Sequence, residues 1–203
     1  MTLVKKHKLM LYWVNKILVW LRRSKYSRGF GVQSPWAYQF IRYVINEHYP
    51  YYSYAELKKS LPDISSRESK VAKLYFRIAN YRQADVVLSY NSESSVYDKY
   101  ISAACHKTAV KHLDNASQLP SGTIEMLILP IVGGYQTIFE SALQHVDEKT
   151  IFVVEGIYED AHRNTFWQQI VSDSRCITTF DLYECGVIFF DSKRYKENYI
   201  VNF

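Results

Sequence analysis

The second half of the chain alternates short apolar runs with helical patterns, and this alternation constrains the fold more than any other feature. Four apolar runs of strand length are bounded by polar or turn residues: residues 85–90, 108–114, 125–129 and 150–155. Between the runs, apolar residues recur at the three- and four-residue spacing of a helix. Strands that alternate with helices in this way build a parallel sheet with helices on its faces. We therefore predict an α/β fold with a mostly parallel sheet.

Two features modify this sheet. Residues 176–182 and 186–190 are apolar runs separated by three residues, which predicts a β-hairpin that closes the chain. Only ten residues, 115–124, separate the second strand from the third. A strand–helix–strand unit takes about 30 residues, and even a bare helical crossover takes at least about 10–12. The second and third strands are therefore joined without room for a further strand and helix.

The first 80 residues show helical spacing throughout. Residues 5–23 predict a basic amphipathic helix. Its apolar stripe is Met10, Trp13, Val14, Ile17, Leu18 and Leu21. Ser34-Pro35 is typical of the cap and first residue of a second helix, and Ser53-x-x-Glu56 and Ser65-x-x-Glu68 are candidate capping boxes. We predict a helical extension over residues 1–68 and an α/β domain over residues 69–203.

The positive charge is concentrated in this N-terminal arm. Nine basic residues precede the first acidic residue, Glu47, whereas the rest of the chain has 16 basic and 20 acidic residues and a net charge of −4. The basic helix is expected to dock on the body, on a protein partner or on a second copy of the chain, and a membrane surface is the other surface that such helices bind. The acidic body disfavours broad contact with nucleic acid.

Cysteine usage and hydropathy favour a cytoplasmic protein. The three cysteines, Cys105, Cys176 and Cys185, show neither the number nor the spacing of a disulfide framework or a metal site. Cys105 follows an apolar helical stripe and is expected in the core. No stretch reaches the 18 apolar residues of a membrane span, and no signal-peptide cleavage site follows the first apolar run.

Ligands of open α/β sheets bind beyond the carboxyl ends of the strands, so the residues there are the candidates for chemistry. The first strand is followed by a turn of Ser, Asn, Tyr and Glu without any glycine, and the second by Asp114. Gly133-Gly134 after the third strand could bind an anion through its amides, but is more typical of a plain turn. After the fourth strand, Glu155, Asp160 and His162 could form a metal site or an acid/base pair, although Asp160 also suits a helix start.

These strand ends resemble those of bacterial class I S-adenosylmethionine-dependent methyltransferases with a helical N-terminal extension. Residues 27–36, Ser-Arg-Gly-Phe-Gly-Val-Gln-Ser-Pro-Trp, look like the Gly-x-His-Ser-Pro-Phe motif with which that subgroup opens. The likeness continues through residues 76–81, 178–182 and 186–190 and covers most of the chain after residue 26. It implies a Rossmann-like methyltransferase-type sheet with a C-terminal β-hairpin and an N-terminal helical extension, shortened because the unit on the adenine side of the cofactor has no room.

The departures from the family fall on its cofactor positions. Where the family has Glu-hydrophobic-Gly-x-x-x-Gly after the first strand, this chain has Ser89 for the acid and Asn91 and Ser95 for the glycines. Asp114 can retain the acid of the second strand. The third strand ends in Pro130 instead of Asp-Gly-x-His, and the fourth in Glu155-Gly156 instead of Asp-Asp. The resemblance thus assigns vestigial cofactor positions to Ser89, Asn91, Asp114 and Glu155.

These losses favour a methyltransferase-fold protein that has lost catalysis and acts as a binding or interaction module. On this hypothesis it has no catalytic residue, no metal and no cofactor. The first alternative is a divergent active methyltransferase, in which Ser89, Asn91 and Asp114 hold S-adenosylmethionine and Glu155 or His162 lies near the acceptor. The second is a peripheral membrane protein that binds through the basic N-terminal helix.

Overall fold

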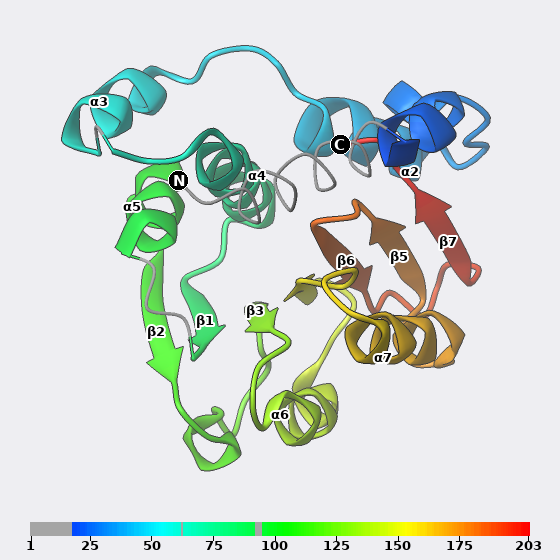
Figure 1. Cartoon of the computed structure of the whole chain (residues 1–203). Coiled ribbons are helices and arrows are strands. Elements are labelled where there is room, and N and C mark those ends of the chain that lie inside the picture. The colour runs from blue at the N-terminus through cyan, green and yellow to red at the C-terminus, as the bar shows by residue number, and fades with distance from the viewer. Residues whose placement is uncertain (1–17, 62, 92–94) are drawn as a thin grey trace, which may run out of the picture.

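A computed structural model describes residues 18–61, 63–91 and 95–203 of the chain. Within these residues seven strands form one sheet in the order β2-β1-β3-β4-β6-β5-β7 (Figure 1). All neighbouring strands are parallel except β6, which is antiparallel to both β4 and β5. The strands are β1 (Val86–Tyr90), β2 (Ala109–Leu113), β3 (Met126–Pro130), β4 (Ile151–Glu155), β5 (Thr178–Asp181), β6 (Cys185–Phe189) and β7 (Glu197–Ile200). The predicted α/β fold with a mostly parallel sheet is confirmed.

Helices cover both faces of the sheet, as Figure 1 shows for α4 on one side and α6 on the other. Successive strand residues point to opposite faces, so Val87 and Val153 pack with α2, α4 and α5, whereas Leu88 and Phe152 pack with α6 and α7. The helices are α2 (Pro35–Phe40), its π-helical continuation η2 (Ile41–Ile45), α3 (Tyr52–Ser60), α4 (Ser66–Arg82), α5 (Ser95–Ala104), α6 (Tyr135–Ala142) and α7 (Ala161–Ser172), with short 3-10 turns η1 (Ser24–Gly29), η3 (Ala116–Gln118) and η4 (Leu143–His145).

The short connection after the second strand has the predicted consequence. β2 lies at the edge of the sheet, and the chain returns from it to β3 through the single turn η3. β1 pairs with β2 on one side and with β3 on the other. The sheet is therefore shortened at its β2 edge, as predicted.

The opposite edge corrects one prediction. β5 and β6 form the expected antiparallel hairpin, with Thr178 opposite Phe189, but the hairpin does not close the chain. β7 follows and pairs in parallel with β5, and the Tyr199 ring stacks on Phe180 at 5.2 Å. This strand is short and buried on one face only, so its apolar pattern is too weak to distinguish it from a tail.

Two of the three predicted helix starts are confirmed. The Ser34 hydroxyl accepts from the Ala37 amide at the start of α2, and the Ser65 hydroxyl accepts from the Glu68 amide at the start of α4. The prediction at Ser53 is wrong, because α3 begins at Tyr52 and Tyr51 caps it without a side-chain bond. α4 runs unbroken from Ser66 to Arg82, and the division of the chain at residues 68/69 stays a prediction.

Most of the predicted helix over residues 5–23 lies outside the described residues. Residues 18–23 are helical, and Arg23 anchors this end to the body. Its guanidinium donates to the Asp181 carboxylate at 2.9 Å and lies 5.3 Å from the rings of both Tyr158 and Tyr183. Leu18 and Leu21, which belong to the predicted apolar stripe, are exposed, so only the Arg23 end is covered by described residues.

Candidate functional site

The four predicted site residues lie along one edge of the sheet. β2, β1, β3 and β4 are parallel, so their carboxyl ends point the same way. Ser89 and Asn91 stand at the end of β1, Asp114 directly follows β2, and Glu155 ends β4. The order of the strands places β3 between the Ser89 and Glu155 strands. The four residues therefore share an edge but divide into two groups.

The β1 end keeps a backbone conformation that suits glycine. Asn91 has φ +44, in the left-handed region, and its amide donates to the Leu113 carbonyl at 2.9 Å. Asparagine tolerates this region better than most residues. The turn after β1 therefore has a left-handed residue without having a glycine. Ser89 is only 2 % exposed, and its register partners are His112 on β2 and Ile128 on β3.

Tyr90 closes the crevice between β1 and β3. The chain moves from β1 outward to β2 and then returns to β3 on the other side, so the topological switch point lies between β1 and β3. At this point the Tyr90 hydroxyl donates to the Gly133 carbonyl. A side chain on Gly134, the cap of α6, would place its Cβ 2.6 Å from the same hydroxyl. Gly133-Gly134 is thus a plain turn whose second glycine makes room for Tyr90.

Asp114 lies on the exposed β2 edge. Its amide donates to the Gln118 side chain at 2.6 Å, which fixes the turn into η3. Its side chain is exposed, and β2 is the last strand on this side. A ligand held by Asp114 would therefore have no further strand of the sheet to cover it.

Glu155 lies in a separate pocket of about 270 Å³ between α4, α5 and the β5–β6 turn. The fully buried Tyr75 donates its hydroxyl to the Glu155 carboxylate, and the Tyr97 ring packs against Tyr75 at 5.1 Å. Burial raises the pKa of Glu155, which the Tyr75 hydrogen bond partly offsets. Burial and the neighbouring Glu155 raise the pKa of Tyr75 well above its usual value. Burial therefore disfavours the charged form of Glu155, and the phenol of Tyr75 donates a hydrogen bond to its carboxylate.

The mouth of this pocket is acidic. Glu68, Glu159 and Glu184 line it together with Glu155, and the Arg67 side chain donates to Glu184 at 2.8 Å. Burial and Glu155 also raise the pKa of the Cys185 thiol, which lies at the back of the pocket. We call the space lined by these residues the Glu155 pocket.

The prediction that Glu155, Asp160 and His162 could form a metal site or an acid/base pair is wrong. Asp160 caps α7 through the Arg163 amide at 2.8 Å, and His162 Nδ1 lies 3.3 Å from the Tyr135 hydroxyl. Glu155 has its own partner in Tyr75, so the three residues do not form one site. Over the described ranges, no group of three or more His, Cys, Asp or Glu residues is arranged to hold a metal.

The prediction that Cys105 lies in the core is also wrong, because Cys105 is partly exposed whereas Cys176 and Cys185 are buried. The helix α5 ends one residue before Cys105, at Ala104. The apolar stripe therefore stops before the cysteine, and its side chain contacts Gln83 at 3.5 Å.

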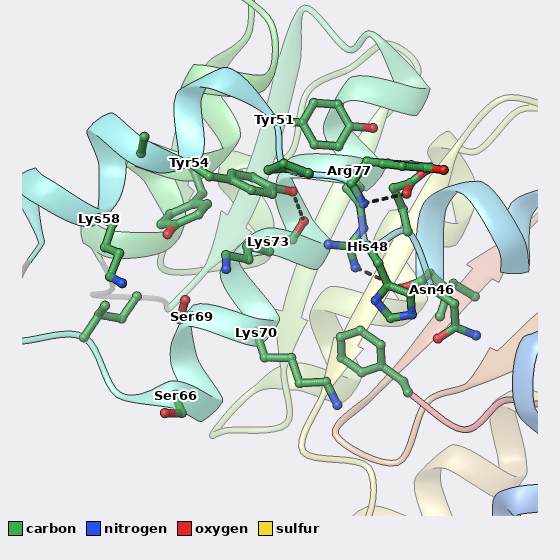
Figure 2. Close-up of a pocket in the computed structure, with 18 of the residues that line it drawn as sticks. Asn46, His48, Tyr51, Tyr54, Lys58, Ser66, Ser69, Lys70, Lys73 and Arg77 are labelled. Atoms are coloured by element: carbon green, nitrogen blue, oxygen red, sulfur yellow. Dashed lines mark hydrogen bonds between the residues drawn. The ribbon is translucent and has the colours of Figure 1, made fainter.

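A larger pocket, of about 900 Å³, lies on the other face of α4 (Figure 2). Ser66, Ser69, Lys70, Lys73 and Arg77 line it from α4, where their spacing puts them on one helical face. The segment after η2, helix α3 and Phe203 supply the remaining walls. We call this space the lysine pocket. The sequence did not predict this pocket, because its walls come from many separate segments, which also include Trp20 and Tyr100.

Comparison with known proteins identifies the fold. No family model matches the sequence, and no curated protein matches it. A solved protein from Staphylococcus aureus assigned as a caffeoyl-CoA O-methyltransferase is similar in structure with a TM-score of 0.52 and 8% identity, over 70% of this chain and 93% of that one.

Two further solved structures have lower scores. A protein from Klebsiella pneumoniae assigned as an O-methyltransferase has a TM-score of 0.49 and 7% identity, over 84% of this chain and 100% of that one. TomG, an O-methyltransferase from Streptomyces achromogenes solved with S-adenosylmethionine, has a TM-score of 0.46 and 13% identity, over 70% and 91%. The sheet order and the Staphylococcus aureus match together show that this chain has a shortened form of the class I methyltransferase fold.

Proposed function

We propose that this protein is a methyltransferase-fold binding or interaction module of the cytoplasm that has lost catalysis. The observation that carries the proposal is the Tyr90–Gly133 hydrogen bond. Ligands of open α/β sheets bind in the crevice at the topological switch point. Here that crevice is bridged by a tyrosine that is only 4 % exposed. A cofactor lying across the ends of β1 and β3 would have to displace it.

Three further observations support the proposal. Cofactor binding at such a loop uses an acid and closely approaching backbone amides, whereas this chain has Ser89 and Asn91 there. Asp114 directly follows β2, an edge strand that has no neighbour on its outer side within the described ranges. The Glu155 pocket, at about 270 Å³, is smaller than the roughly 300–1,000 Å³ of most ligand sites.

Calorimetric titration with S-adenosylmethionine and S-adenosylhomocysteine tests the proposal. We expect no binding heat and no thermal stabilisation at millimolar ligand, because the cofactor crevice is closed. Binding in the micromolar range, about −8 kcal/mol, that is lost in Asp114→Ala would overturn the proposal. Lys111→Ala, on an exposed residue of the same strand, is the matched control, since it removes a side chain without touching the cofactor positions.

A specific observation favours a second candidate, a divergent methyltransferase that uses S-adenosylmethionine. Glu155 is a carboxyl group with a raised pKa at a strand end, and such a group can accept a proton from an acceptor hydroxyl near neutral pH. The similar solved structure from Staphylococcus aureus is assigned as an O-methyltransferase. On this hypothesis Glu155→Gln abolishes methyl transfer and leaves cofactor binding unchanged, whereas Asp114→Ala weakens binding.

The N-terminal helix supports a proposal about partners. Leu18, Trp20 and Leu21 expose large apolar side chains beside the anchored Arg23, which suits docking of a protein partner or of a second copy. Among the described residues, no helix is long and apolar enough to cross a bilayer. Size-exclusion chromatography of Leu18→Ser/Leu21→Ser against the unchanged chain tests self-association, and binding to anionic vesicles that falls with salt would instead favour a membrane surface.

A further inference from the structure

The lysine pocket has fixed walls. The buried Arg77 guanidinium donates to the Val44 carbonyl and, at 2.9 Å, to the Ile45 carbonyl, so it ties α4 to the end of η2 (Figure 2). On the α3 side, the Tyr54 hydroxyl donates to the Lys73 carbonyl at 3.4 Å. Tyr54 also packs against Tyr51 and Phe76, at 5.4 and 5.0 Å between ring centroids. The pocket is therefore held open by contacts that do not depend on a ligand.

The pocket is strongly basic. Lys58 from α3 and Lys70, Lys73 and Arg77 from α4 line it, against a single carboxylate, Glu47. In the part of the chain that the structure describes, no salt bridge involves Lys58, Lys73 or Arg77. Cations gathered around a concave surface raise the local concentration of anions. The charge therefore points to an anionic ligand.

Polar groups suited to an anion accompany the cations. The hydroxyls of Ser66 and Ser69 lie one turn apart on the same face of α4 and line the pocket. Hydroxyl donors beside lysines suit phosphate oxygens.

Aromatic side chains form a further part of the lining. Trp20 and Tyr49 are 56 % and 80 % exposed at the rim. The Phe203 ring faces the pocket, with the Lys70 ammonium 4.1 Å from its centroid. Exposed aromatic faces bind planar rings by stacking. A ligand that fills this pocket of about 900 Å³ would combine a planar ring with its negative charge, and this volume is typical of small-molecule sites.

We propose that the lysine pocket binds a nucleotide, with its phosphates among Lys58, Lys70, Lys73 and the two serine hydroxyls and its base against the aromatic rim. The inference goes beyond the proposed function, because α4 separates this pocket from Glu155 and from the cofactor edge. It holds whether or not methyl transfer is retained. S-adenosylmethionine has the base but no phosphate, so it serves as a control ligand for this pocket.

Titration calorimetry of the full chain with ATP tests the inference, with tripolyphosphate and adenosine as the two halves of the ligand. We expect ATP to bind with a micromolar to submillimolar Kd and each half to bind at least about tenfold more weakly. Equal binding of ATP and tripolyphosphate would overturn the nucleotide assignment, since the aromatic rim would then contribute nothing. Absence of ATP binding at millimolar concentration would overturn it as well.

Two neighbouring lysines provide a matched pair of variants. Lys58 lines the pocket, whereas Lys59 is equally exposed on α3 but does not. We expect Lys58→Glu to raise the Kd for ATP about fivefold to tenfold and Lys59→Glu to change it less than twofold. The reason is that a charge in the pocket wall acts directly on the phosphates, whereas solvent and salt screen a charge outside the pocket. Equal weakening by both variants would mean non-specific attraction and would overturn the site. Micromolar S-adenosylmethionine binding that survives Lys58→Glu would instead contradict the proposed function and leave this inference intact.

Discussion

The two pockets on either side of helix α4 differ in size, in charge and in the way their walls are held. The lysine pocket measures about 900 Å³ and gathers four basic side chains. The Glu155 pocket measures about 270 Å³ and gathers four carboxylates around one arginine, Arg67. Helix α4 thus separates a basic pocket from an acidic one, and three of the four carboxylates of the acidic pocket come from other segments.

The difference shows which side of α4 has more room for a ligand. The Glu155 pocket lies at the sheet edge that binds ligands in α/β folds, but it encloses only about 270 Å³. The lysine pocket is built from the helical segments before the sheet and from the C-terminal residues, so the missing strand at the β2 edge does not affect it. The volume of the lysine pocket therefore does not depend on the edge of the sheet at which the fold is shortened.

Among the variants that compare the two sides of α4, Arg77→Ala is expected to lower the stability most. Arg77 is 6 % exposed and is the donor to two carbonyls at the end of η2. Its removal leaves both carbonyls without that donor and opens a cavity, at a cost of about 3 kcal/mol. Thermal denaturation should show a Tm lower by roughly 6–12 °C.

Arg67→Ala is the matched control on the acidic face of α4. Arg67 is half exposed and pairs with Glu184, and surface ion pairs contribute about 0–1 kcal/mol. We expect a Tm within about 4 °C of the unchanged protein. A loss equal to that of Arg77→Ala would show that the two faces of α4 are held in the same way.

Tyr75→Phe tests the acidic face with a smaller effect. The Tyr75 hydroxyl donates to Glu155 and lowers the pKa of that carboxyl, so its removal leaves a carboxylate with less support. A hydrogen bond to a charged group contributes about 1.5–3 kcal/mol. Urea unfolding at pH 8 should show a loss of about 2 kcal/mol, and the loss should shrink at pH 4, where Glu155 is protonated in both proteins.

Tyr97→Phe is the control for this change, because Tyr97 packs against Tyr75 in the same pocket but, among the described residues, forms no hydrogen bond with Glu155. Its loss should be small and independent of pH. If Tyr75→Phe is equally insensitive to pH, the Tyr75–Glu155 bond does not depend on the charge of the carboxyl group.

The sequence was sufficient to predict six of the seven strands and the shortened edge. The apolar runs at 85–90 and 150–155 form mostly buried strands, which produce a strong local signal, and the ten residues 115–124 leave no room for another unit. The helix starts at Ser34 and Ser65 depend on side chains adjacent in sequence, so they were also predictable. β7 was missed because an edge strand buried on one face has a weak pattern.

The candidate site was less accessible from the sequence. Ser89, Asn91, Asp114 and Glu155 were correctly assigned to strand ends, but their contacts depend on residues far along the chain. Tyr75 reads as one more apolar position in the α4 stripe, and nothing local indicates that its hydroxyl meets Glu155, 80 residues away. Tyr90 likewise reads as the last residue of a strand, and its bond to Gly133 follows only from the order of the strands.

Glu155→Gln tests the acidic side of α4 and has the smallest expected effect on stability. The folded protein raises the pKa of Glu155 above its usual value, mainly by burial. A raised carboxyl pKa means that the folded state binds the proton more tightly than the unfolded state does. Glu155 therefore contributes to folding stability at low pH, and this contribution is lost as the pH rises through the pKa of the folded state. Glutamine can still accept from Tyr75 and carries no charge to desolvate. The variant should therefore match the unchanged protein at pH 4 and have a Tm about 1–4 °C higher at pH 8.

Glu159→Gln is the control for this last change, because Glu159 is half exposed at the mouth of the same pocket and forms ion pairs with Arg163 and Arg67. Its removal should not stabilise the protein at pH 8, since an exposed carboxylate has little desolvation to regain. If Glu155→Gln instead lowers the Tm at pH 8, the ionised carboxylate stabilises the fold. The charged carboxylates of the Glu155 pocket would then contribute to the stability of the fold and would not oppose it.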